Sequence, residues 1–157
     1  MNNSLEVLSE SLSLKIKVLQ DIASYNKKQT EAFSKDDVDM ESFDEAIEEK
    51  GQLIERLEEL DNGFEILYEK IAELLKQNKN QYAAQIREIQ EKITVITEMS
   101  MSIQAEEARN KKLIEEYFAK ERNSIKSSRV GSKAAYDYYK NMNGVNVSAH
   151  SILDSKQ

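Results

Sequence analysis

Residues 81–126 contain neither proline nor glycine, and their apolar residues recur at helical spacing. Steps of three, four and seven return to the same side of a 3.6-residue turn. As one helix of about 46 residues, this stretch would reach roughly 70 Å. We expect two shorter helices upstream to bury one side of this rod and to leave part of it for a partner. The residues that share its apolar face are Ile86, Ile89, Ile93, Ile96, Ile103, Ile114 and Tyr117.

Composition favours an all-α fold. The 157 residues include no proline and four glycines, and 32% of them are charged, which suits an elongated helical bundle. The chain has no cysteine, so it has no disulfide framework or thiolate zinc site, and a reducing compartment is allowed. Nowhere does the sequence contain 18 consecutive apolar residues, and its N-terminus lacks the features of a secretion signal. We therefore expect a soluble, cytoplasmic protein without membrane insertion. A net charge of −7 argues against nucleic-acid binding.

The pattern predicts an elongated antiparallel bundle, or coiled-coil hairpin, of three long helices over residues 1–127. The helices are expected at about 4–33, 40–77 and 81–127, with Asn3 and Glu6 spaced as a capping box for the first. The short connection at 77–80 predicts that the second and third helices are antiparallel neighbours. Residues 128–157 are expected to form a flexible tail with a short helix at 133–141.

The second helix raises two questions. Either Asp39 caps it, or Ser42 and Glu45 form a capping box. Asn62 and Gly63 are a turn signal, but the apolar residues keep a near-heptad seam across them, so we favour one continuous helix. The seam consists of Phe43, Ile47, Ile54, Leu57, Leu60, Phe64, Leu67, Ile71 and Leu74.

Acidic residues are concentrated in residues 35–61, which contain twelve aspartates and glutamates but only three lysines and arginines. This run is either a patch that steers a basic partner or the solvated face of the second helix.

No catalytic motif is evident in the sequence. The only histidine, His150, has no glutamate three residues before it, so neither a di-iron site nor a metalloprotease motif is present. We expect no enzyme activity, metal or cofactor.

Two stretches favour contact with another protein. Met99, Met101 and Ile103 precede a polar step that includes Asn110, and the apolar face resumes at Ile114 and Tyr117. Methionine-rich surfaces adapt to varied partners, but the same residues could be core methionines next to a polar step that sets helix register. Near the C-terminus, an aromatic cluster is typical of interfaces, although a small helix folding back on the bundle would also explain it. That cluster is Tyr136, Tyr138 and Tyr139.

Taken in order, these features resemble the FlgN-type flagellar export chaperones. The resemblance rests on the leucine-rich first helix, on residues 48–57 and 104–113, and on a tyrosine-bearing tail that ends in residues 152–156. In the third helix, Glu107 and Asn110 precede an apolar pair, as in that family.

The resemblance implies a cytoplasmic chaperone that binds hook-associated proteins, keeps them unassembled and delivers them to the flagellar export apparatus without hydrolysing nucleotide. An amphipathic helix of the exported subunit would lie along the third helix. Two alternatives stay open: a structural coiled coil that self-associates, for example as a homodimer, or a chaperone for another substrate such as the filament-cap protein. The candidate partner-binding residues are Met99, Met101, Ile103, Asn110, Ile114, Tyr117, Tyr136, Tyr138, Tyr139 and Leu153.

Overall fold

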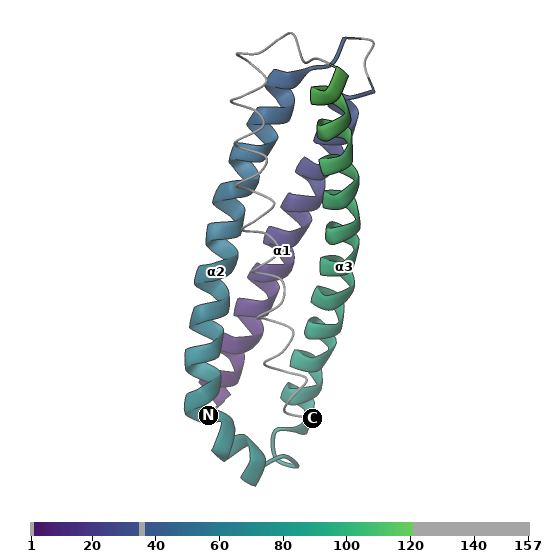
Figure 1. The fold of residues 1–157 in the computed structure, drawn as a ribbon. Coiled ribbons are helices and arrows are strands. Elements are labelled where there is room, and N and C mark those ends of the chain that lie inside the picture. The colour runs from purple at the N-terminus through teal and green to yellow at the C-terminus, as the bar shows by residue number, and fades with distance from the viewer. Residues whose placement is uncertain (1, 35–36, 121–157) are drawn as a thin grey trace.

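The structure is a computed structural model that describes residues 2–34 and 37–120, and these residues form three long α-helices and no strand (Figure 1). The helices are α1 (Asn2–Ala32), α2 (Met40–Gln77) and α3 (Ala83–Lys120). The predicted all-α helical bundle is therefore confirmed. The boundary at 127, the tail at 128–157 and the short helix at 133–141 lie outside the described residues and stay predictions.

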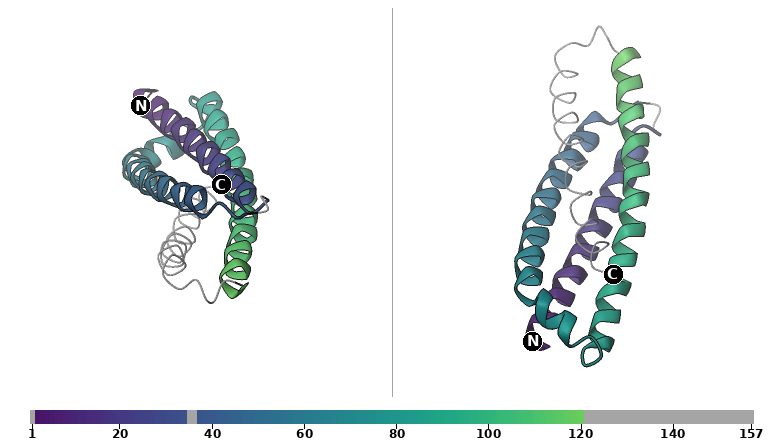
Figure 2. Two further views of the ribbon diagram at one scale, coloured as in Figure 1. Left: turned by 90° about the horizontal axis from the view of Figure 1, so that it is seen from above. Right: turned by 60° about the horizontal axis from the view of Figure 1, so that its bottom comes forward.

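Helix α1 lies between the other two and packs against both of them (Figure 2). No Cα atom of α2 lies within 8 Å of a Cα atom of α3. The short connection does make α2 and α3 antiparallel (Figure 1), but the prediction that they are neighbours is wrong. The expectation that both upstream helices bury α3 is also wrong, since only α1 packs on it. The short connection makes α3 run antiparallel to α2, but it does not determine which helix α3 packs against.

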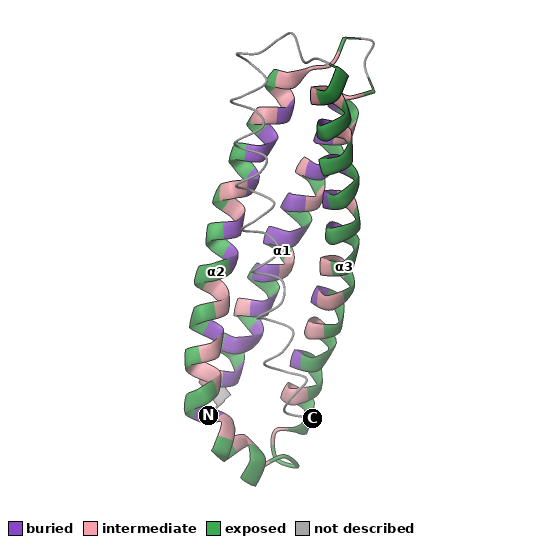
Figure 3. Ribbon diagram, viewed as in Figure 1, coloured by how far each residue is buried: buried purple, intermediate pink, exposed green. Residues whose placement is uncertain are grey.

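The width of the buried stripe on each helix explains this arrangement (Figure 3). On α1, adjacent residues are buried together at 8–9 and 18–19, so the stripe is wide enough to face two neighbours. On the first part of α3, Ile89, Ile96 and Ile103 are buried at intervals of seven. That narrow seam covers one neighbour only.

The N-terminus of α2 is capped by Asp39. Its carboxylate accepts hydrogen bonds from the Ser42 backbone N–H at 3.1 Å and from Ser42 Oγ at 2.7 Å. Of the two predicted starts, the Asp39 cap is therefore the one observed. At the other end of the hairpin, α1 already includes Asn2, so Asn3 lies inside the helix and does not cap it.

Helix α2 runs without interruption through Asn62 and Gly63, as predicted. Gly63 is exposed and has no positive φ, and a Cβ atom added there would meet nothing within 4 Å. We expect Gly63→Ala to raise the free energy of unfolding by about 1 kcal/mol, because glycine has the greater freedom in the unfolded chain. Urea denaturation followed by circular dichroism measures this change. Gly51→Ala, which is equally unobstructed, should act in the same direction, and a loss of stability at Gly63 alone would contradict a continuous helix.

Candidate partner-binding surface

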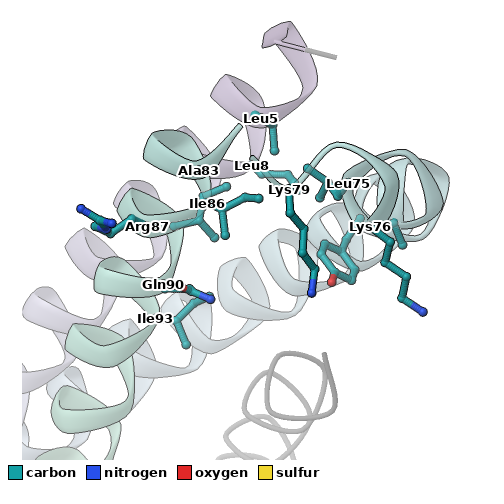
Figure 4. A pocket seen from close by; sticks show the side chains of 13 residues that line it. Leu5, Leu8, Leu75, Lys76, Lys79, Ala83, Ile86, Arg87, Gln90 and Ile93 are labelled. Carbon is teal, nitrogen blue, oxygen red and sulfur yellow. The ribbon is translucent and has the colours of Figure 1, made fainter. Parts of the chain in front are cut away.

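An open groove lies between α2 and α3, with α1 as its floor, near the α1 N-terminus (Figure 4). Its volume is about 590 Å³, within the usual range of protein binding pockets. Leu5, Leu8 and Ile89 at its base are buried, whereas the apolar side chains on its walls are half-buried. The wall residues include Tyr68, Ala72 and Leu75 from α2 and Ile86 and Ile93 from α3. The groove exists because α2 and α3 both pack on α1 and leave the space between them open.

The charged residues that line the groove are all basic: Lys76, Lys79 and Arg87. Lys79 extends between the α2 and α3 side chains, while Lys76 and Arg87 project outward from opposite sides (Figure 4). An all-basic set of charged lining residues is unusual in a chain of net charge −7. A second hollow, between α1 and α2, is lined by four glutamates and one lysine. The groove therefore combines an apolar base with a cationic rim.

A buried polar cluster joins the three helices at another level of the bundle. Lys50 Nζ of α2 is fully buried and donates to Asn26 Oδ1 at 2.6 Å, to Gln29 Oε1, and to Glu107 Oε1 of α3 at 2.7 Å. Asn110 donates from Nδ2 to the Asn26 carbonyl at 3.1 Å and accepts from Thr30 Oγ1 at 2.8 Å. The ion pair between Lys50 and Glu107 thus bridges α2 and α3 across α1.

Burial lowers the pKa of Lys50 to about 8, and the nearby Glu107 carboxylate opposes that shift. Between this value and the ordinary pKa near 10.5, the unfolded chain binds a proton that the folded chain has released. Stability must therefore rise with pH across that interval. We expect a gain on the order of 2 kcal/mol between pH 7 and pH 9.5.

Urea denaturation at several pH values tests this expectation. The double variant Lys50→Met with Glu107→Leu removes the titrating pair and should lose the rise. A wild-type stability that is flat or falls over the interval would show that folding does not lower the pKa of Lys50.

The FlgN protein family model matches residues 1–144 of the chain, including all three helices. The chain belongs to the FlgN family. This membership supports a flagellar export chaperone in general terms and does not specify its substrate. No curated protein and no solved structure matches the chain.

None of the helices in residues 2–34 and 37–120 of this FlgN-family chain combines the length and the apolar character that a membrane span requires. The same residues contain no group of three or more His, Asp or Glu side chains placed to hold a metal ion.

The structure separates the predicted partner-binding residues of this FlgN-family protein. Ile103, Asn110 and Ile114 are buried against the rest of the bundle. Ile103 and Ile114 were chosen because they were expected to be exposed, and on that point the prediction is wrong for these two. Met99 and Tyr117 are half-buried, and Met101 is 66% exposed. The binding role of all six stays a prediction, while Tyr136, Tyr138, Tyr139 and Leu153 lie outside the described residues.

Tyr117 belongs to an aromatic cluster at the end of the bundle away from the groove. Its ring centroid lies 5.9 Å from that of Phe33, which in turn packs edge-on against Phe43 at 5.2 Å. Phe118 lies on the other side of Tyr117, at 5.7 Å. Phe33, which directly follows α1, therefore links Tyr117 of α3 to Phe43 of α2, and part of the Tyr117 ring is used in packing within the fold.

Sequence reasoning missed the groove and the role of Lys50. Ile86, Ile89 and Ile93 were placed on the apolar face of the third helix but were not chosen as a site. Two of the three cations that accompany them, Lys76 and Lys79, come from outside that helix. For Lys50 a signal existed: the seam steps by seven from Ile47 to Ile54, and Lys50 fills the missing position.

Proposed function

We propose that this protein is a cytoplasmic export chaperone that binds hook-associated proteins, keeps them unassembled and delivers them to the flagellar export apparatus. The observation that carries the proposal is the FlgN family match over residues 1–144. The protein would act by binding alone, without catalysis. A chaperone of this kind must cover an aggregation-prone segment of its client until release.

The shape of the bundle supports this role. The backbones of α2 and α3 do not pack against each other, and the groove between these helices keeps half-buried apolar side chains along its walls. An amphipathic helix of the client laid in such a groove would cover both apolar surfaces at once. Exposed Met101, half-buried Met99 and Tyr117, and the tail residues Tyr136, Tyr138, Tyr139 and Leu153 remain candidate secondary contacts.

Co-expression with candidate clients tests the proposal. The tagged chain should recover a hook-associated protein in a complex of defined stoichiometry, and a strain that lacks the chain should fail to export that subunit. Failure to recover any hook-associated protein, together with normal swimming of the deletion strain, would contradict the proposal. Recovery of the filament-cap protein alone would assign a different client, and assembly of the isolated chain into long oligomers would favour a structural coiled coil.

A further inference from the structure

The groove between α2 and α3 carries a charge signature that restricts what can occupy it. Its lining contains Lys76, Lys79 and Arg87 and no carboxylate. None of these three cations has an ion-pair or hydrogen-bond partner among residues 2–34 and 37–120. Elsewhere in the bundle Lys15, Lys50 and Lys92 are all paired with acidic residues. The lining of the apolar groove therefore holds three cations and no carboxylate that could neutralise them.

The dimensions of the groove suit a short length of helix. Its α3 wall extends from Ala83 to Ile93, which corresponds to about 15 Å, or roughly three helical turns. A helix lying there would direct one apolar stripe at the base formed by Leu5 and Leu8. The two flanks of that stripe would then meet the cationic rim. Carboxylates on those flanks would be attracted, whereas lysines or arginines would be repelled.

The chain's own C-terminal segment does not have this charge. Residues 121–157 carry six lysines and arginines against three aspartates and glutamates, so the segment is basic overall. Placed in the groove, it would add positive charge to a rim that is already positive. Charge complementarity therefore favours an acidic occupant from another protein over this segment.

We propose that the groove bordered by Lys76, Lys79 and Arg87 binds an amphipathic client helix whose apolar stripe is flanked by aspartates and glutamates. This inference rests on the proposed chaperone function and adds the chemistry by which the client is recognised. The apolar base supplies most of the contact area. The cationic rim selects among helices of similar hydrophobicity and increases their rate of association.

Two synthetic peptides test the charge preference on the full chain. Both carry the same leucine stripe at steps of three and four, and they differ only in glutamate or lysine at the flanking positions. Fluorescence anisotropy should show the glutamate peptide binding about tenfold more tightly than the lysine peptide, with an advantage that shrinks as salt is added. Equal affinities, or tighter binding of the lysine peptide, would overturn the proposal.

A pair of matched variants locates the preference. Lys79→Glu with Arg87→Glu should reverse it, because these changes invert the rim and spare Lys76 in the last turn of α2. Lys111→Glu with Lys112→Glu makes the same change in net charge at two exposed positions, about 36 Å beyond Arg87 along α3, and should leave the preference intact. If both double variants behave alike, the preference is general electrostatics and the groove is not the site.

Crosslinking identifies the occupant. Because the chain has no cysteine, Gln90→Cys on the groove wall accepts a single photocrosslinker. In the presence of the glutamate peptide, the crosslink should join the peptide to the groove. A crosslink to residues 121–157 or to a second copy of the chain would overturn the proposal.

The charge preference and the chaperone function can fail separately. If the charge preference is lost while hook-associated proteins still co-purify, the chaperone function stands. If the charge preference is intact but no flagellar client is recovered, only the chaperone function is contradicted.

Discussion

Replacement of Lys50 by methionine is expected to lower the free energy of unfolding by about 3–5 kcal/mol. Methionine fills a similar volume but cannot donate to Asn26 Oδ1 or Gln29 Oε1. It also leaves the Glu107 carboxylate buried without the cation that now lies 2.7 Å away. The cost therefore comes mainly from groups stranded in the core. Urea denaturation monitored by circular dichroism gives the value directly.

Two controls separate this explanation from a general loss of charge. Lys111→Met removes an exposed lysine and should change stability by less than about 0.5 kcal/mol. The double variant Lys50→Met with Glu107→Leu removes the stranded charge and should be more stable than Lys50→Met alone. If the loss of stability in the double variant, relative to the wild type, equals the sum of the losses in Lys50→Met and Glu107→Leu, the two residues are not coupled.

Ile103→Ala is expected to lower the free energy of unfolding by about 2–5 kcal/mol, because it leaves a cavity between α3 and α1. Ile103 is 1% exposed, whereas Met101, two residues earlier on the same helix, is 66% exposed. Met101→Ala should therefore change stability by no more than about 0.5 kcal/mol. Thermal and urea denaturation of the two variants in parallel measure the contrast.

The same two variants decide between the two interpretations of this stretch. If Ile103→Ala costs little stability but weakens client binding, Ile103 faces a partner and not the core. If Met101→Ala weakens client binding without loss of stability, Met101 is a contact residue. Ile103→Glu should prevent folding, since it would place an unpaired carboxylate in the core.

Much of the fold could be predicted because helical spacing and caps are local signals. The seam across Asn62 and Gly63 predicted a continuous α2, and Asp39 was one of two candidates for its cap. The central position of α1 was not predicted. The third segment was predicted to be the central helix because it is the longest. The number of neighbours of a helix depends instead on the width of its buried stripe, and on α1 that stripe is wide because adjacent residues such as Leu8 and Ser9 are both buried.

The candidate site was harder to predict because it depends on packing between distant segments. Glu107 and Asn110 were recognised as a polar step in an apolar seam, and setting helix register was one of two explanations considered. The polar residues that contact this step are Asn26 and Gln29 on α1 and Lys50 on α2. That these polar positions lie at the same level of the bundle was not predicted, because no local sequence signal shows how the three helices are aligned. The cationic groove depends in the same way on bringing Lys79 and Arg87 together with α1.

The central position of α1 also bears on how the protein forms during translation. The α1–α2 hairpin is complete before the ribosome has made α3, and a nascent chain folds from its N-terminus. Until α3 emerges, one side of α1 is bare and Lys50 still has access to water. Docking of α3 then brings Glu107 to Lys50 and seals the polar cluster, so we expect the nascent chain to reach its final stability only after about residue 110 has left the exit tunnel.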